Sequence, residues 1–218
     1  MTIELKNASR TYNRGFSLEE INLKIKAGVI TSVLGKSGSG KSTLAAMAGG
    51  ILAPKSGNVY ADKDDIYKYD DKKRAAFRND NIGYVVQGNS GLRSLTVLEN
   101  VLLPTLIRGK KKSESVEKAR NLLCKLGIEK LSDVYINELS GGELRRMAIA
   151  RALINDPKII IADEPTGDLD DDNTNTVLKL FRIYADNGAG ILIITHDISV
   201  LDYSDESYIM KDGRLALQ

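Results

Sequence analysis

The sequence has one cysteine and no long apolar run, and each shortage excludes a class of protein. Cys124 alone cannot form an internal disulfide, which indicates a reducing compartment. The longest apolar stretches, "VLLPTLI" and "KIIIA", fall far short of the roughly 20 residues that a membrane helix needs, so we expect no membrane span. The first ten residues, "MTIELKNASR", lack the basic head and apolar run of a secretory signal.

The chain also lacks an excess of charge of one sign. It has 31 Lys and Arg against 29 Asp and Glu, a formal net charge of +2. This balance favours no dominant polyanion as a partner, so we expect no nucleic acid. With 42% hydrophobic residues among 218, the composition is that of a folded protein with one domain, or with a core and an inserted lobe.

The first third of the chain is typical of strands. "TIELKNAS" and "INLKIKAG" alternate apolar and polar residues, as half-buried strands do. "VITSVLG" is more continuously apolar, which predicts a buried central strand that ends in a glycine-rich loop. "TLAAMAGG" then predicts a helix that stops at a glycine pair.

The pattern changes between residues 88 and 156. "LTVLENVLLPTLIRG", "SESVEKARNLLCKLG" and "GGELRRMAIARALIN" predict three helices without a strand among them. "PKIIIADEP" and "AGILIITHD" then predict buried strands, and "DESYIMKDGRLALQ" predicts a hairpin that turns at Asp212 and Gly213. We therefore expect one domain over 1–218, in which a helical lobe (88–156) interrupts a strand-and-helix core (1–87 and 157–218).

The lysine-rich stretch "RGKKKSESVEK", residues 108–118, allows two interpretations. It can contact anionic lipid or a partner protein, or it can be a solvated loop that leads into a helix. The second is the more common use of such a run.

The stretch "GKSGSGKS" predicts a phosphate-binding loop. It fits G-x-x-x-x-G-K-[ST], and it follows a predicted strand and opens a helix, which is the context that this motif requires. Glycines let successive backbone N–H groups point at phosphate oxygens, and the helix N-terminus adds a positive dipole. Lys41 can contact the β- and γ-phosphates, and the Ser42 hydroxyl can bind Mg²⁺. The alternative, an ordinary Gly/Ser-rich turn, does not need this context. The expected nucleotide-binding residues are Gly35, Ser37, Gly38, Ser39, Gly40, Lys41, Ser42 and Thr43.

Two carboxylates at the end of "IIIADEP" are expected at the same site. Asp163 lies at the carboxyl end of a predicted buried strand, where open parallel sheets bind ligands, so it can hold Mg²⁺ beside Ser42. Glu164 is placed to polarise the attacking water, a group that phosphoryl transfer to water needs besides the metal. The alternative, an acidic pair that caps a helix, is disfavoured because Pro165 follows immediately.

His196, the single histidine, ends the predicted strand "ILIIT". A lone histidine is usually an incidental surface or core residue. This one leaves the same edge of the sheet as Asp163, so its imidazole is expected to reach the γ-phosphate or the attacking water.

The stretch "ELSGGELRR" predicts a second phosphate-binding loop. Ser140 followed by Glu143 is a capping box, but a cap does not require Gly141 and Gly142, which are poor helix formers. Bare backbone N–H groups beside a hydroxyl at a helix N-terminus bind phosphate. Because one ATP is already held by the first loop, we expect two copies facing head to tail, each offering its Ser140 loop to the nucleotide on the other.

In this order and spacing, "GKSGSGKS", "LSGGE", "IIIADEP" and "ITHD" resemble the ATP-binding subunit of an ABC (ATP-binding cassette) transporter, over essentially the whole chain. The resemblance implies an α/β P-loop NTPase cassette with a RecA-like parallel-sheet core, an N-terminal antiparallel β subdomain and an inserted α-helical subdomain. It also implies ATP and Mg²⁺ as ligands, and catalytic roles for Lys41, Glu164, His196 and Gln87. Further, it implies that Gln87 binds Mg²⁺ and links the γ-phosphate site to the helical lobe, that Tyr12 stacks on adenine, and that Asp168 crosses a dimer interface.

The sequence that surrounds the motifs is similar to that of one branch of this family. "ADEPTGDLD" with "SLTVLENVLLP" resembles the ATPases of lipoprotein release, macrolide export and cell division, and of related antimicrobial-peptide exporters. The chain departs from that pattern in three places: "VVQ" lacks an aromatic before the glutamine, "GGELRRMAIA" lacks paired glutamines, and "GDLD" replaces "GNLD". These departures remove no catalytic group.

The resemblance implies a second cassette, with a homodimer expected, and an integral membrane permease as partners. The protein would then lie in the cytoplasm against the inner face of the membrane, with docking near "GNSGLRSLTVLENVLLP" for export or mechanotransmission. Two alternatives stay open. One is a soluble ATPase that acts on DNA or ribosomes, although the chain has neither a long coiled coil nor a second cassette. The other is a nucleotide sensor without turnover, which the presence of Lys41, Glu164 and His196 disfavours.

Overall fold

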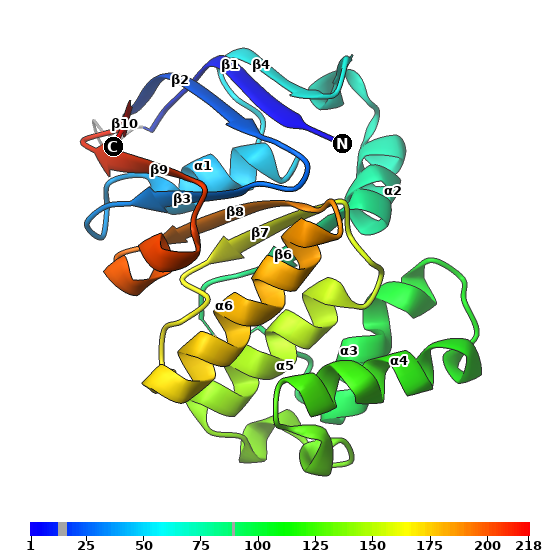
Figure 1. Ribbon diagram of the computed structural model, residues 1–218. Coiled ribbons are helices and arrows are strands. Elements are labelled where there is room, and N and C mark those ends of the chain that lie inside the picture. Colours follow the sequence, from blue (N-terminus) through cyan, green and yellow to red (C-terminus); the bar gives the residue numbers. More distant parts are fainter. Residues whose placement is uncertain (13–16, 89) are drawn as a thin grey trace.

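The computed structural model describes residues 1–12, 17–88 and 90–218, arranged as two β-sheets and a set of helices (Figure 1). The first sheet has four antiparallel strands in the order β2-β1-β4-β5. Its strands are β1 (Ile3–Thr11), β2 (Ser17–Ile25), β4 (Ser56–Ala61) and β5 (Asp64–Asp65). The alternation of apolar and polar residues in the first two strands buries one face of this sheet.

The second sheet has six strands in the order β10-β9-β3-β8-β7-β6, and all neighbours are parallel except the β9–β10 hairpin. Its strands are β3 (Ile30–Leu34), β6 (Ile82–Val85), β7 (Ile159–Asp163), β8 (Gly190–Thr195), β9 (Glu206–Lys211) and β10 (Arg214–Leu217). The predicted hairpin at Asp212 and Gly213 is confirmed. Because β7 and β8 are covered on both faces, their sequences are continuously apolar.

Alternate residues of the six-stranded sheet pack into two separate hydrophobic clusters. Ile159 and Ile161 of β7 face α1 (Lys41–Ala48), which lies between the two sheets. Ile160 and Ala162 face the other side, where α6 (Asp171–Asp186) covers the sheet. The period of two along a strand therefore decides which layer each isoleucine joins.

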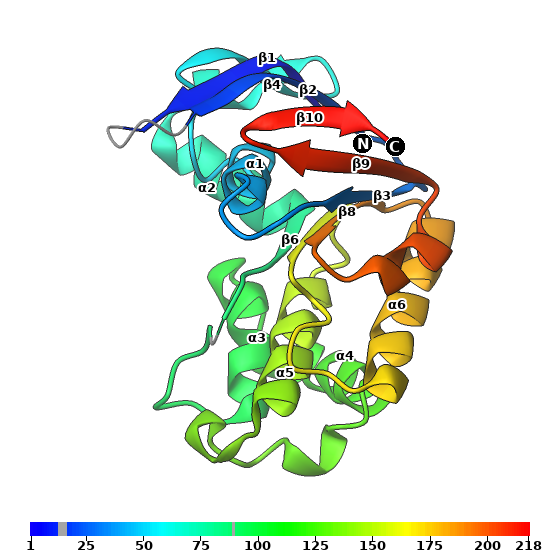
Figure 2. The same ribbon diagram turned by 90° about the vertical axis from the view of Figure 1, so that its left-hand side faces the viewer.

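Three helices lie between β6 and β7 in the chain: α3 (Val97–Ile107), α4 (Lys112–Lys125) and α5 (Gly141–Leu153). They confirm the three helices predicted there. Figure 2 shows them at the end of the molecule away from the β1-β2-β4 sheet. Capping boxes at Thr96 and Ser140 begin α3 and α5, and each satisfies orphan N–H groups at a helix start.

The helix α2 (Asp71–Asn81) was not predicted. It buries none of its residues, so it carries no apolar stripe that a periodic pattern can reveal. Its remaining signal is Asp70, whose side chain accepts a hydrogen bond from the backbone N–H of Lys73. Short 3₁₀ turns at Ile66–Lys68, Glu129–Leu131, Ile136–Glu138 and Ile198–Tyr203 were also not predicted. In the described segments, no helix combines the length and apolar composition needed to cross a membrane.

The contact between β6 and α5 brings the helices onto the core at close range. A Cβ atom on Gly83 of β6 would lie 2.4 Å from the carbonyl oxygen of Ala152 and 2.8 Å from Cγ of Pro157. Only glycine fits there without a backbone shift. The backbone of α5 therefore lies directly against β6 near the C-terminal end of the helix.

Asp205, which directly precedes β9, forms hydrogen bonds that connect this strand to β3 and α6. Its Oδ2 accepts hydrogen bonds from the backbone N–H of Ile30 at 2.7 Å and from Nη1 of Arg182 at 2.9 Å. Arg182 also donates to the carbonyl oxygen of Gly28 at 3.2 Å. Burial by itself raises the pKa of Asp205, but the Ile30 N–H and the Arg182 guanidinium outweigh it, so the pKa lies below its ordinary value.

We expect Asp205→Asn to lower the free energy of unfolding by about 1 kcal/mol at pH 7, because it removes charge-assisted hydrogen bonds at a partly exposed site. Since the pKa of Asp205 is lower in the folded state, its contribution is complete above the unfolded pKa of about 3.9 and is lost as pH falls through the folded pKa. Urea unfolding at pH 7 and at several values below pH 4 measures the difference.

Asp186→Asn is the matched control, because Asp186 pairs with the same Arg182 at 2.9 Å but is more exposed. This exposed pair is expected to contribute only a few tenths of a kcal/mol. A loss for Asp205→Asn that stays constant with pH would contradict the prediction.

Candidate nucleotide-binding and hydrolysis site

The loop from Gly35 to Gly40 joins β3 to α1, as the motif predicts. Lys41 is the first residue of α1, and its side chain is only 7% exposed. Its Nζ donates to the carbonyl oxygens of Gly35 at 2.6 Å and Lys36 at 3.1 Å, so the loop holds the charged end of the side chain. The Ser39 hydroxyl is buried beneath the same loop.

Four segments that are distant in the sequence line one hollow of about 440 Å³. The loop before α1, the segment after β6, the end of β7 and the end of β8 all contribute. The lining residues are Ser37, Gly38, Gly40, Lys41, Ser42, Thr43, Gln87, Glu164 and His196. Each was predicted from the sequence as a site residue, and the parallel strands bring them together because their carboxyl ends meet at one edge.

Asp163 lies at the end of β7 and is 4% exposed. Burial raises its pKa, and a hydrogen bond with the Ser42 side chain and the charge of Lys41 act in the opposite direction. Its Oδ1 is buried and has no hydrogen-bond partner within the described part of the chain. An orphaned buried carboxylate oxygen beside a hydroxyl is a place where a cation would satisfy the carboxylate.

This donor set fits Mg²⁺. Mg²⁺ prefers oxygen ligands and is commonly bound by one or two protein groups together with substrate phosphates. Ser42 and Asp163 supply a hydroxyl and a carboxylate oxygen, and Gln87 brings an amide oxygen to the hollow. Among the described residues no cluster of three or more His, Cys, Asp or Glu side chains is placed to hold a metal ion.

Glu164 follows β7 directly with a backbone φ of 50°, in the left-handed region. This conformation costs an L-residue about 1 to 3 kcal/mol, and such strain gathers at functional sites. Its N–H donates to the carbonyl oxygen of Ile194 at 2.8 Å, which fixes the turn against β8. Its carboxylate therefore contacts groups that differ from those around Asp163: Oε1 lies 3.8 Å from Nζ of Lys41, and Oε2 lies 3.0 Å from Nδ1 of His196.

His196 and Gln87 lie at the exposed edge of the hollow: the His196 side chain is 74% exposed, and Gln87 is also exposed. Both therefore present polar atoms to a ligand without a desolvation cost at the outset.

Tyr12 lies beside the phosphate-binding loop. Its hydroxyl is 3.3 Å from Oγ1 of Thr43, and the guanidinium of Arg10 lies 5.7 Å from the centre of its ring. The ring is partly exposed, so an aromatic side chain lies at the surface next to the loop. Residues 13–16, which follow Tyr12, lie outside the described residues.

Ser140, Gly141 and Gly142 line a different hollow, together with Asp168. It shares no residue with the first hollow. Ser140 caps α5, and its hydroxyl accepts from the N–H of Glu143 at 3.3 Å. The predicted second loop is thus exposed at a helix N-terminus, where it lines a hollow of its own.

The sequence explains Gly142 by an exposed backbone N–H group, and the structure adds a second reason for a glycine at this position. A Cβ atom on Gly142 would lie 2.9 Å from the carbonyl oxygen of Asp168, so the loop that carries Asp168 needs this space. Asp168 itself has a φ of 65°. Gly142 therefore serves the packing of two loops as well as any exposure of backbone N–H groups.

Sequence reasoning missed two residues at the site. Arg145 is buried in α5, and its Nη1 donates to the carbonyl oxygen of Val86 at 2.9 Å, directly before Gln87. An arginine near a helix start is usually exposed, so the sequence holds no signal for this contact. Thr195 is fully buried at the end of β8 and bonds to Glu164. Its position next to His196 was an available signal.

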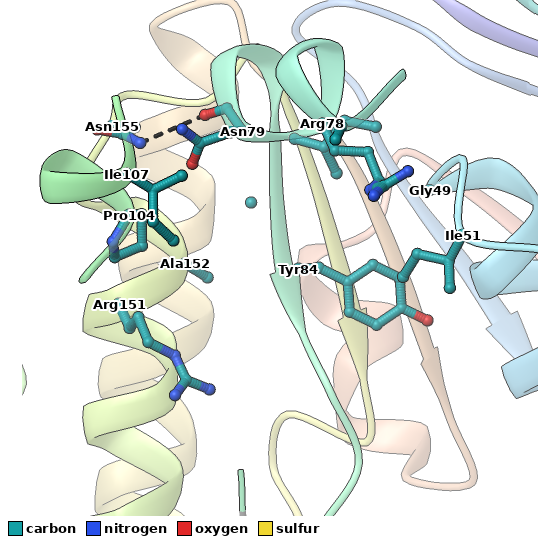
Figure 3. A pocket seen from close by; sticks show the side chains of 13 residues that line it. Gly49, Ile51, Arg78, Asn79, Tyr84, Pro104, Ile107, Arg151, Ala152 and Asn155 are labelled. Atoms are coloured by element: carbon teal, nitrogen blue, oxygen red, sulfur yellow. Dashed lines mark hydrogen bonds between the residues drawn. The ribbon is translucent and has the colours of Figure 1, made fainter. Parts of the chain in front are cut away.

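A third hollow of about 350 Å³ lies where α2, β6, α3 and α5 meet (Figure 3). Pro104 and Ile107 of α3 face Tyr84 of β6 and Ile51 across it. Ile107 is 75% exposed at the edge of this hollow. The predicted docking segment 88–104 reaches this hollow at Pro104; Asn89 within that segment lies outside the described residues.

Comparison with known proteins gives consistent matches. The family model for the ABC transporter matches residues 18–167. The lipoprotein-releasing system ATP-binding protein LolD of Hyphomonas neptunium is 39% identical over 218 residues, covering 98% of this chain and 96% of that protein.

Two solved structures of the bacterial ABC transporter cassette MJ0796 also match. One is a dimeric structure, with a TM-score of 0.93 and 36% identity over 99% of this chain and 98% of that one. The other is a dimeric post-hydrolysis state bound to ADP and Pi, with a TM-score of 0.92, the same identity and the same coverage. Fold, motifs and relatives agree, and the chain belongs to the ABC transporter family as an ATP-binding ATPase cassette.

Proposed function

We propose that this protein is the ATP-hydrolysing subunit of a membrane transporter of the export or mechanotransmission type. Two copies close on ATP and part after hydrolysis, and this movement drives separate membrane subunits. The lipoprotein-releasing name of a relative that is 39% identical supports this branch. The protein would work at the inner face of the membrane, held there by its membrane partner.

The separation of two phosphate-binding hollows is the observation that carries the proposal. The Lys41 hollow and the Ser140 hollow have no residue in common, although both combine glycines and a serine with the start of a helix. In the proposed dimer, the Ser140 hollow of one copy lies against the Lys41 hollow of the other, so that both contact a single nucleotide. The dimeric structures of a cassette that is 36% identical support this arrangement.

The proposed chemistry follows from the contacts. The loop N–H groups and Lys41 bind the β- and γ-phosphates, while Ser42, Asp163 and Gln87 would hold Mg²⁺. When bound, Mg²⁺ neutralises charge on the phosphate oxygens. Glu164 orients and polarises the attacking water with Oε1, and His196 supports the carboxylate through Oε2 and reaches the γ-phosphate.

The remaining proposed roles concern the nucleotide base and the second copy. Tyr12 stacks on the adenine ring, which its exposed face beside Thr43 supports. Ser140, Gly141 and Gly142 contact the γ-phosphate on the other copy, and Asp168 lies at the boundary between the copies.

We propose the apolar hollow beside Ile107 as the docking site of the membrane partner. The hollow lies between the helical lobe and the six-stranded sheet, so an occupant would contact both. Ile51, Pro104 and Ile107 line the same hollow, and Ile51 and Ile107 are exposed, so a partner that fills the hollow would remove a continuous apolar surface from water.

We expect Glu164→Gln to bind ATP but to slow turnover by roughly a hundredfold or more, because the amide cannot take up a proton from water. ATP-bound dimers should then accumulate. Steady-state phosphate release and size-exclusion chromatography with ATP measure both effects.

Lys41→Ala should instead weaken ATP binding itself and give no dimer. Glu117→Gln, at an exposed position of α4, is the matched control and should behave as the parent. Turnover of Glu164→Gln at the parental rate would show that Glu164 does not position the water.

We expect Ile107→Glu to reduce recovery of the membrane partner while leaving ATP hydrolysis by the isolated protein unchanged, because a charge replaces an apolar contact at an exposed position. The assay is a pull-down with the tagged Glu164→Gln protein and ATP from detergent-solubilised membranes of its host, with and without Ile107→Glu. Mass spectrometry should identify a multi-span protein.

Ile183→Glu is the control, because Ile183 is 51% exposed on α6 and does not line this hollow. Equal recovery of the multi-span protein with both substitutions would move the docking site elsewhere. Recovery of soluble partners alone, with the tagged protein absent from membranes, would contradict the proposed transporter role. It would not affect the proposed ATPase chemistry.

A further inference from the structure

Thr195 places a hydroxyl in the interior directly beneath the site. It is the last residue of β8 and is fully buried. A buried hydroxyl is costly unless it is hydrogen-bonded. Here Oγ1 lies 2.8 Å from Oε2 of Glu164 and 3.0 Å from the backbone nitrogen of Asp197.

The direction of the hydroxyl proton follows from these two partners. The backbone N–H of Asp197 can only donate, so Thr195 accepts from it. An ionised carboxylate can only accept, so the Thr195 proton points at Glu164. A hydrogen bond to a carboxylate belongs to the stronger class, which favours one fixed orientation.

The segment around Thr195 is itself held in place. Oγ1 of Thr166 donates to Oδ2 of Asp197 at 2.8 Å, and the backbone N–H of Ser199 donates to Oδ1 of Asp197 at 2.9 Å. Thr166 is also buried, so the loop after β7 and the loop after β8 are joined below the surface. The Thr195 hydroxyl therefore lies on a segment that these hydrogen bonds hold in place.

The two oxygens of Glu164 consequently have different surroundings. Oε2 contacts the Thr195 hydroxyl, the His196 backbone N–H at 3.4 Å and His196 Nδ1 at 3.0 Å. Oε1 lies on the side of Lys41, 3.8 Å from Nζ, in a residue that lines the hollow. Oε2 is therefore held by hydrogen-bonding groups of the residues that end β8, whereas Oε1 is directed to the phosphate-binding loop.

We propose that Thr195 is a positioning residue for hydrolysis: its hydroxyl fixes Oε2 of Glu164 so that Oε1 faces the attacking water. The inference rests on the proposed function of Glu164. Thr195 acts through that carboxylate. Removal of its hydroxyl is therefore expected to slow the chemical step and to leave the affinity for ATP unchanged.

The test compares Thr195→Val, which keeps the shape and removes the hydrogen bonds to Glu164 and from Asp197, with Thr195→Ser, which keeps both. Because small misplacements of a reacting group have large rate effects, Thr195→Val should lower kcat by about 10- to 100-fold. The KM for ATP and the affinity for ATP should stay within about twofold of the parent. Thr195→Ser should recover most of kcat.

Thr31→Val is the matched control. Thr31 is fully buried on β3, the strand beside β8, and its Oγ1 has no hydrogen-bond partner within the described part of the chain. The same change of a buried threonine to valine should therefore leave kcat at the parental value. If Thr195→Val does not fold, Thr195→Cys, a weak donor of similar size, takes its place and should also lower kcat.

Three results would overturn the inference: parental kcat in Thr195→Val, kcat in Thr195→Ser as low as in Thr195→Val, or an equal fall in Thr31→Val. A rise in the KM for ATP that accounts for the whole loss would overturn it as well. Glu164→Gln measured alongside separates the two proposals. If Glu164→Gln abolishes turnover and Thr195→Val does not change it, only the role of Thr195 fails; if Glu164→Gln turns over normally, the proposed function of the site fails.

Discussion

The parallel hydrogen-bonded ladder of β3, β8 and β7 is the constraint on which the rest of the site depends. Leu34 pairs with Thr195, and Asp163 pairs with Ile194, so the three strands end at nearly the same level. The phosphate-binding loop, Glu164 and His196 leave the sheet at this edge. A slip of one residue would exchange the faces of a strand and bury its functional side chains in the wrong layer. The apolar packing on both faces keeps that register.

The residues that meet at this edge of the sheet could be predicted from the sequence, because the residue type changes at the end of each buried strand. "VITSVLG" runs into glycines, "IIIAD" into two carboxylates and "ILIIT" into the histidine. The capping boxes that begin α3 and α5 likewise indicate helices in the sequence alone. These signals are local, so a single sequence carries them.

The features that escaped prediction depend on contacts between distant segments. Arg145 reaches the carbonyl of Val86, 59 residues away in the chain. The space around Gly142 is taken up by the carbonyl of Asp168, and nothing in "LSGGE" indicates this neighbour. The helix α2 buries none of its residues fully, so its contacts with the core leave little pattern in the sequence. In each case the packing decides what the residue does, and composition or spacing does not record packing.

The close contact at Gly83 has a mechanical consequence. It fixes one end of α5 to the core through Ala152, while the opposite end of the helix carries Ser140. A helix of 13 residues is about 20 Å long, so a tilt of about 10° around this fulcrum would displace the Ser140 end by about 3 Å. Arg145 lies between the two ends of the helix and donates to the carbonyl oxygen of Val86, so the same rotation would also displace the backbone next to Gln87.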